Sequence, residues 1–228
     1  MYERNGIKYP RVTDIISDCT DSSSALIQWA ANQTVEWIKE NCDKSIDILD
    51  DWYHVCGEDL EQARFAYKDT SHTALDVGSN VHNAIEKHLK GETFTLLSNQ
   101  AETAFKAFLK WKEEVDLVPL KLEQIVWGER WAGTLDFFGK YKGRLYIIDW
   151  KTSKAFYMTE MGAQIAAYRS CVPDAEGSGI LRLDKETGLP EWKDFSKRYL
   201  RDLDVFNKMV DLYFAKHTKI RARFENKS

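Results

Sequence analysis

Three short β-rich segments in the middle of the chain constrain its fold more than any other feature. They span residues 122–127, 131–139 and 144–150. Gly128 and Gly143 lie in the short turns between them, and the last segment contains four consecutive apolar residues, from Leu145 to Ile148. Such a run, without alternation, is typical of a central strand buried on both faces. The spacing therefore predicts an antiparallel meander whose last strand lies inside a larger sheet.

Apolar residues recur at helical spacing on both sides of this meander. Val77, Val81 and Ile85 form one such stripe, and Asn99 is a candidate N-cap with Glu102 in the capping-box position. This order of strands and helices predicts an α/β (α+β) fold with a mixed central sheet flanked by helices. The expected elements are helices over about 25–37, 58–68, 73–89, 99–115, 159–169 and 199–217, and a strand over 179–183.

Charge is distributed unevenly along the chain, although the net charge is only −4. The first 80 residues contain 7 basic and 15 acidic side chains, whereas the remainder contains 25 and 21. The charge distribution and the change from helical to strand patterns together predict an N-terminal helical subdomain over residues 1–75 and a core with a C-terminal helix over 76–228. A basic working surface would then lie in the core, and a chance scatter of surface charge is the alternative.

Several classes of protein are disfavoured by what the sequence lacks. No window approaches the roughly 18 consecutive apolar residues of a membrane span, and the N-terminus has no apolar signal segment, so we expect no membrane association. Four separated cysteines without a C-x-x-C pair favour a reduced, intracellular protein. The lack of G-x-G-x-x-G, Walker and G-x-S-x-G motifs disfavours a nucleotide cofactor and a serine hydrolase.

The residues that carry chemistry lie at the ends of two neighbouring segments of the meander. Asp136 belongs to Gly133-Thr-Leu-Asp, and Asp149 and Lys151 follow the apolar run. Adjacent strands lie about 4.8 Å apart, so both carboxylates can converge on one divalent cation such as Mg²⁺ or Mn²⁺. Lys151 is two residues past Asp149 and points to the same side of its strand. The alternative is a surface ion pair at a strand end, because an acidic-x-Lys triplet is common by chance.

Two further pairs of residues accompany this group. Gln164 and Tyr168 lie four apart on one expected helix, and His82 and Glu86 lie four apart on another. The ordered set G-x-x-x-H, G-T-L-D, D-W-K-T-S and Q-x-x-x-Y resembles the PD-(D/E)XK nuclease superfamily, specifically its RecB-type branch. That branch includes phage-encoded exonucleases and the mitochondrial genome maintenance exonuclease. The resemblance covers roughly residues 76–170.

The resemblance implies a restriction-endonuclease-like core and a role for each matched residue. The metal would be Mg²⁺ or Mn²⁺. Lys151 would be the catalytic lysine. Gln164 and Tyr168 would act with it by positioning the lysine or the scissile strand. Leu135 stands where the superfamily name has proline, and the iron–sulfur cysteines of some relatives are absent. The implied metal ligands are His82, Asp136, Asp149 and the backbone carbonyl of Trp150.

Other residues near these motifs have weaker roles. Thr152 and Ser153 are candidates for contacts with a DNA phosphate. Trp131 and Trp150 are candidates for stacking on bases. Glu123, on the first segment of the meander, is a weaker candidate metal ligand. Glu86 is expected to pair with Lys90 rather than with a metal.

The resemblance leads us to expect a metal-dependent DNA exonuclease that hydrolyses phosphodiester bonds. Its expected substrate is single-stranded or end-processed DNA in replication, recombination or repair. A structure- or sequence-specific endonuclease and a non-catalytic DNA-binding subunit with the nuclease fold are the alternatives. By analogy alone, a helicase or a single-strand-binding protein is a candidate partner, and the cytoplasm of a bacterial or phage-infected cell is the expected location.

Overall fold

The computed structural model describes residues 1–20, 23–46 and 51–225, and contacts divide the chain into two compact units. Unit 1 consists of Met1–Thr20 and Val77–Ser228, and unit 2 consists of Asp21–Asp76. The sequence predicts one N-terminal subdomain over residues 1–75. The first 20 residues instead belong to unit 1, because Val12, Ile15 and Ile16 are buried in its hydrophobic core.

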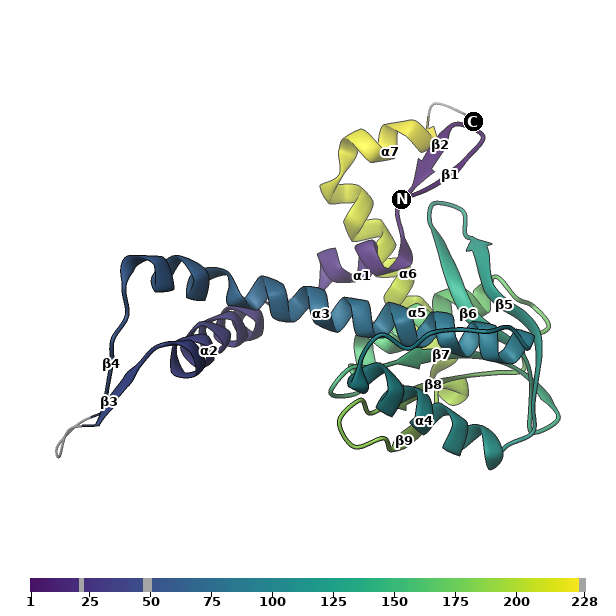
Figure 1. The fold of residues 1–228 in the computed structure, drawn as a ribbon. Helices are drawn as coiled ribbons and strands as arrows, with labels where there is room; N and C mark the ends of the chain where they lie inside the picture. Colours follow the sequence, from purple (N-terminus) through teal and green to yellow (C-terminus); the bar gives the residue numbers. More distant parts are fainter. Residues whose placement is uncertain (21–22, 47–50, 226–228) are drawn as a thin grey trace. The chain divides into compact units, whose positions relative to one another are not determined.

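A five-stranded mixed sheet forms the centre of unit 1 (Figure 1). The first three strands are an antiparallel meander, the fourth pairs in parallel with the third, and the fifth is antiparallel to the fourth. The predicted mixed α/β fold, with helices flanking the sheet, is therefore confirmed. The strands in spatial order are β5 (Leu117–Trp127), β6 (Ala132–Tyr141), β7 (Arg144–Lys151), β8 (Gly177–Leu183) and β9 (Pro190–Asp194).

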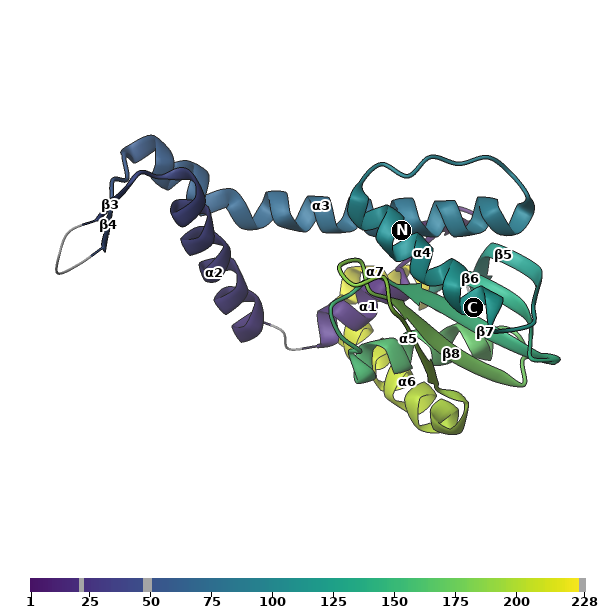
Figure 2. The same cartoon turned by 60° about the horizontal axis from the view of Figure 1, so that its bottom comes forward.

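Helices cover both faces of this sheet (Figure 2). One face packs against α4 (Asn99–Glu113) and the part of α3 (Gly57–Lys90) that belongs to unit 1. The other face packs against α1 (Val12–Cys19), α5 (Met158–Ser170) and α6 (Tyr199–Lys216).

Strand β7 explains why both faces need a cover. Ile147 lies in one hydrophobic cluster and Ile148 in the other, and both side chains are fully buried. Successive residues of a strand point to opposite faces, so an uninterrupted apolar run must be covered on both sides. The predicted central position of this strand is therefore confirmed.

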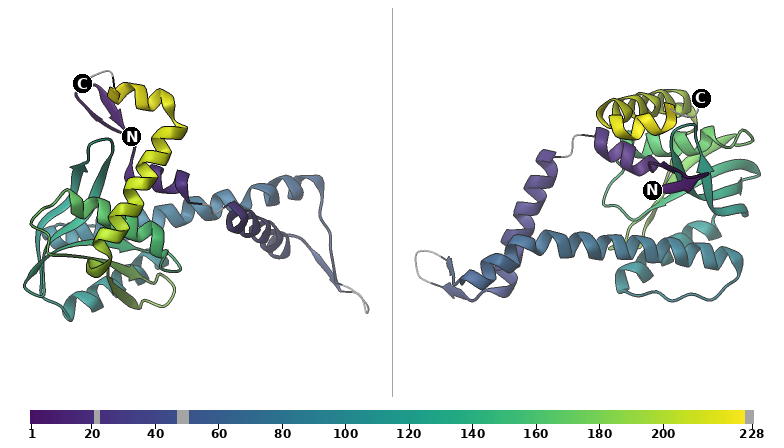
Figure 3. Two further views of the ribbon diagram at one scale, coloured as in Figure 1. Left: turned by 180° about the vertical axis from the view of Figure 1, so that it is seen from behind. Right: turned by 90° about the horizontal axis from the view of Figure 1, so that it is seen from above.

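The first and last described segments of the chain lie side by side in unit 1 (Figure 3). A hairpin of β1 (Tyr2–Arg4) and β2 (Ile7–Tyr9) lies beside α7 (Thr218–Glu225), and the rings of Tyr9 and Phe224 meet edge to face at 5.1 Å. The sequence analysis predicted neither this hairpin nor β9. Strands of three to five residues are too short for alternation to distinguish them from loops.

Unit 2 contains α2 (Ser23–Asn41), a hairpin of β3 (Lys44–Ile46) and β4 (Asp51–Tyr53), and the first part of α3. The helix α3 is continuous, although the sequence predicted separate helices over 58–68 and 73–89. Its polar middle contains Thr70 and Thr73, whose hydroxyls donate to the carbonyls of Ala66 and Asp69 one turn earlier. Hydroxyls satisfied in this way let the helix continue.

Smaller differences concern the ends of elements. Ser98, rather than Asn99, caps α4, because its hydroxyl accepts a hydrogen bond from the amide of Ala101 at 3.2 Å. Strand β5 begins at Leu117, five residues earlier than predicted. Among the described residues, none of the helices combines the length and the apolar character needed to cross a membrane.

Candidate functional site

Three carboxylates lie side by side across β5, β6 and β7. Glu123 falls between the pairs Leu122↔Phe137 and Gln124↔Leu135, so it lies opposite Asp136. Asp149 lies one residue beyond the pair Phe137↔Ile148, which places it beside Asp136 on the other side. Sheet pairing alone therefore places the three residues next to one another on adjacent strands. Neighbouring strands of a sheet lie about 5 Å apart.

His82 reaches this row from α3. Its Nδ1 lies 3.4 Å from Asp136 Oδ2 and 4.0 Å from Glu123 Oε1. One ligand atom from each of these three residues lies within 4.8 Å of the other two. The position of the histidine follows from the burial of its neighbours Val81 and Ile85, which hold this part of α3 against the sheet.

Asp136 and Asp149 are held by different contacts. Asp136 Oδ2 accepts a hydrogen bond of 2.8 Å from the backbone amide of Trp150, which fixes the carboxylate across two strands. Asp149 is 1% exposed, and Lys151 Nζ lies 2.6 Å from its Oδ2. No hydrogen bond from a described residue reaches that oxygen with acceptable geometry. A buried carboxylate oxygen with one ion-pair contact has remaining capacity for a cation.

Burial and mutual charge displace the pKa values of the whole cluster. Burial disfavours the charged form of His82, but the adjacent Asp136 outweighs burial and raises the His82 pKa to about 9. Burial, followed by the charge of Asp136, raises the pKa of Glu123 to about 7. Burial raises the pKa of Asp149 to about 6, although Lys151 opposes this shift. Burial also favours the neutral form of Asp136, but His82, Lys151 and the Trp150 amide together outweigh burial and lower the Asp136 pKa.

These residues fit a divalent cation. Three carboxylates with at least one under-satisfied oxygen are the hard ligands that Mg²⁺ and Mn²⁺ prefer, and an imidazole nitrogen suits Mn²⁺ as well. A cation would also offset the repulsion from Asp136, which adds to burial in raising the pKa values of Glu123 and Asp149. The carbonyl of Trp150 as a further ligand remains a prediction.

Glu123 is a stronger candidate metal ligand in the structure than in the sequence. Its φ angle is +47°, in the left-handed region, although it lies inside a strand and is not glycine. Such a conformation is unfavourable by about 1–3 kcal/mol and is frequent at functional sites. Nothing in the sequence signals this backbone conformation, which is why Glu123 ranked below the aspartates.

Gln164 and Tyr168 share a face of α5, as predicted. Gln164 Nε2 donates a hydrogen bond of 3.1 Å to the Tyr168 hydroxyl, and both side chains are buried. Burial, and then the charge of Asp149, raise the Tyr168 pKa well above its usual value. The tyrosine ring packs on Gly133, where a Cβ would come within 2.5 Å of it. The pair therefore borders the carboxylate row.

The remaining predicted residues have mixed outcomes. Thr152 lies against α3, with its Oγ1 3.4 Å from where a Cβ of Gly78 would be, and Ser153 donates its hydroxyl to the carbonyl of Ala155. Their contacts with phosphate remain a prediction. Glu86 pairs with Lys90 at 2.6 Å, as predicted.

The stacking role of the two tryptophans needs correction. Trp131 is buried and packs edge to face on Phe206, and Trp150 is buried against Phe108 and Phe137. At 1% exposure, Trp150 has no face for a base. Trp131 is 7% exposed, and it lines a cavity whose lining includes none of the carboxylates of the row.

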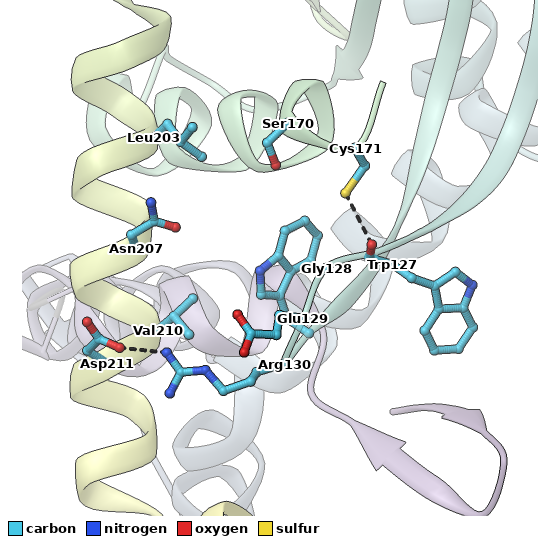
Figure 4. A pocket seen from close by; sticks show the side chains of 11 residues that line it. Trp127, Gly128, Glu129, Arg130, Ser170, Cys171, Leu203, Asn207, Val210 and Asp211 are labelled. Atoms are coloured by element: carbon cyan, nitrogen blue, oxygen red, sulfur yellow. Dashed lines mark hydrogen bonds and ion pairs between the residues drawn. The ribbon is translucent and has the colours of Figure 1, made fainter. Parts of the chain in front are cut away.

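A cavity of about 530 Å³ lies at the turn between β5 and β6 (Figure 4). Arg130 and Asp211 form an ion pair of 2.6 Å at its edge, and the Cys171 thiol donates to the carbonyl of Trp127 at 3.5 Å. Of the residues predicted from the sequence, Trp131 alone lines this cavity. The carboxylate row with His82 and Lys151 is therefore the candidate site.

Neither a protein-family model nor a curated protein matches this chain.

Proposed function

We propose that this protein is a divalent-metal-dependent hydrolase of DNA phosphodiester bonds. The observation that carries the proposal is the convergence of His82, Glu123 and Asp136 within 4.8 Å, next to a buried Asp149 paired with Lys151. Carboxylates that hold a cation next to a fixed ammonium group are suited to a reaction in which a phosphate gains negative charge.

His82, Glu123, Asp136 and Asp149 would hold Mg²⁺ or Mn²⁺. When bound, the ion would supply Lewis acidity toward the phosphate and the attacking water. Burial lowers the Lys151 pKa, but Asp149 and Asp136 outweigh burial and raise it above its ordinary value. The lysine therefore remains a cation at neutral pH. It stabilises charge at the phosphate rather than acting as a general base.

Gln164 and Tyr168 would keep the other side of the site in place. Their hydrogen bond fixes both side chains on α5 next to the charge of Asp149. The raised pKa of Tyr168 means that its hydroxyl keeps its proton at neutral pH and can donate it to an acceptor.

Exonuclease action on single-stranded or end-processed DNA, in replication, recombination or repair, is the form of the proposal that we favour. It rests on the ordered motifs with a histidine on the preceding helix. The proposal includes a location inside a bacterial or phage-infected cell, and a helicase or single-strand-binding protein as partner. Four unpaired thiols agree with a reducing compartment.

The test is digestion of end-labelled DNA and RNA, single- and double-stranded, linear and circular, with Mg²⁺ or Mn²⁺. We expect metal-dependent loss of linear DNA, with activity largely lost in Lys151→Ala although the protein still folds. Lys106→Ala, an exposed lysine on α4, is the matched control. Cleavage of circles would favour the endonuclease alternative. Unimpaired cleavage by Lys151→Ala would refute the assignment of the site, and no cleavage by folded wild type would favour a DNA-binding subunit.

A further inference from the structure

The segment Thr152–Tyr157, which joins Lys151 to α5, is held by a buried arginine. Arg182 Nη1 donates to the carbonyl oxygens of Ser153 at 3.1 Å and Lys154 at 3.2 Å. The arginine side chain is only 8% exposed. A buried guanidinium that binds two successive carbonyls fixes the path of the backbone between them.

Arg182 is itself fixed with respect to Lys151. The two residues are partners in the parallel register of β7 and β8. Asp184 and Glu191 both pair with the guanidinium, and the contact with Asp184 is 3.2 Å. These contacts satisfy the charge of the arginine inside the protein, so its role is to position the segment rather than to meet a ligand.

Both ends of the segment are anchored as well. Thr152 packs against Gly78 of α3, and Phe156 packs against the hydrophobic core of unit 1. Two large side chains of the segment remain exposed, Lys154 and Tyr157. Tyr157 is 52% exposed, and among the described residues of unit 1 it is the one exposed aromatic side chain.

A lysine of β9 contacts both chain neighbours of this tyrosine. Lys193 Nζ lies 4.6 Å from the ring centre of Phe156 and 3.6 Å from the sulfur of Met158, the two neighbours of Tyr157 in the chain. Neither Lys193 nor Lys154 has a carboxylate partner among the described residues. The segment held by Arg182 thus carries an exposed aromatic ring, an exposed lysine three residues before it, and a second lysine that contacts both chain neighbours of the tyrosine.

We propose that Tyr157 is a stacking platform for a base of a single nucleic-acid strand, and that Lys154 and Lys193 bind the phosphates of that strand. Aromatic rings combined with nearby cations are the means by which proteins hold single strands without reading their sequence. The inference rests on the proposed function, because that function brings a strand to Lys151. Arg182 is the positioning residue that keeps this platform in register with the site.

The experiment measures binding with Ca²⁺ in place of the catalytic cation, by fluorescence anisotropy of a labelled oligothymidylate. A second strand of equal length consists of abasic sites and keeps the phosphates alone. We expect Tyr157→Ala to weaken binding of the oligothymidylate about tenfold, with little change for the abasic strand, and Tyr157→Phe to bind both strands like wild type. Leu200→Ala, an exposed residue of α6, is the control.

The lysines should behave differently from the tyrosine. Lys154→Ala and Lys193→Ala should weaken binding of both strands alike. Each should also reduce the slope of the logarithm of the binding constant against the logarithm of the salt concentration by about one. Equal affinity of wild type and Tyr157→Ala for oligothymidylate, or an equal loss on both strands, would overturn the stacking role. A wild type that binds with this preference but cleaves nothing under Mg²⁺ or Mn²⁺ would refute the hydrolase and still support the platform.

Discussion

Unit 1 and unit 2 differ in burial and in charge. Unit 1 has a sheet covered on both faces, whereas Ala63 and Ala66 are the buried residues among the described part of unit 2. Residues 21–76 contain 12 acidic and 4 basic side chains, so unit 2 has a net charge of −8 and unit 1 one of +4. Every residue of the candidate site lies in unit 1. The pKa values of His82, Glu123 and Asp149, all in unit 1, are strongly displaced, and the net charge of unit 1 favours a polyanion.

The largest expected effect comes from replacing a carboxylate of unit 1, compared with replacing one of unit 2. Asp136→Asn removes a ligand while keeping its shape, so we expect the affinity for Mn²⁺ to fall about 100-fold or more and cleavage about 10³-fold. Asp69→Asn, an exposed change in unit 2, should alter neither. Calorimetric titration with Mn²⁺ and single-turnover cleavage measure both quantities. Unchanged Mn²⁺ affinity in Asp136→Asn would remove the metal centre from this site.

The second prediction uses α3, which belongs to both units. Ile85 is fully buried in unit 1, whereas Leu75 is 66% exposed in unit 2. Ile85→Ala should lower the free energy of unfolding by about 3 kcal/mol through a cavity, and Leu75→Ala by less than about 0.5 kcal/mol. Urea denaturation followed by circular dichroism gives both values. Similar losses would mean that unit 2 is as tightly packed as unit 1.

The third prediction compares two arginines. Arg182→Lys cannot reproduce the planar set of contacts to two carbonyls and two carboxylates, and we expect it to cost about 2 kcal/mol of stability. Arg64→Lys, at an exposed ion pair in unit 2, should be nearly neutral. Thermal unfolding of the two variants makes the comparison. An equally mild effect at Arg182 would show that the segment after Lys151 is held by its other anchors.

The fourth prediction concerns pH. Metal binding requires a neutral His82, whose pKa is raised to about 9, so below that pH each bound ion displaces a proton. Between pH 7 and 8.5 the affinity for Mn²⁺ should rise about tenfold per pH unit, measured by calorimetry. His82→Gln should flatten this slope, and His72→Gln in unit 2 should leave it unchanged. A slope that survives His82→Gln would assign the displaced proton to another group.

The stability of the metal-free protein should change with pH in the opposite direction to its affinity for Mn²⁺. The pKa of His82 is raised in the folded state, so its contribution is complete below pH 6.5 and is lost as the pH rises through about 9. The raised pKa values of Glu123 and Asp149 act in the same direction at lower pH. The melting temperature without metal should therefore fall from pH 6.5 to 9, and added Mn²⁺ should reverse the fall. A melting temperature independent of pH would contradict the coupling of these groups.

Much of unit 1 could be predicted because its strands have strong local signals. The apolar run before Asp149 places β7 in the middle of the sheet, and Gly143 lies in the turn that separates β7 from β6. The same signals place Asp136 and Asp149 on neighbouring strands. Short elements such as β1, β2 and β9 have no such signal, because three to five residues do not establish a period.

The candidate site was predictable only in part. The spacing of Asp149 and Lys151 puts both on one side of a strand, and their side chains do meet. Glu123 itself adopts a left-handed backbone conformation inside β5, which its residue type does not signal, and Arg182 is placed by the parallel pairing of β7 with β8. That pairing joins residues far apart in the sequence. Trp131 and Trp150 were misjudged because proximity in sequence to a site does not say which side of the sheet a ring occupies.

The sequence by itself determined the order of the elements from α4 to β8, the central position of β7 and the pairing of acid and lysine at its end, because period and apolar runs act over a few residues. Tertiary structure alone decided that the first 20 residues belong to unit 1, that α3 brings His82 to Asp136, and that Glu123 completes the cluster. These contacts join residues from about 13 to more than 100 positions apart in the chain. Packing of the whole sheet and its helices selects such contacts, and no local propensity encodes them.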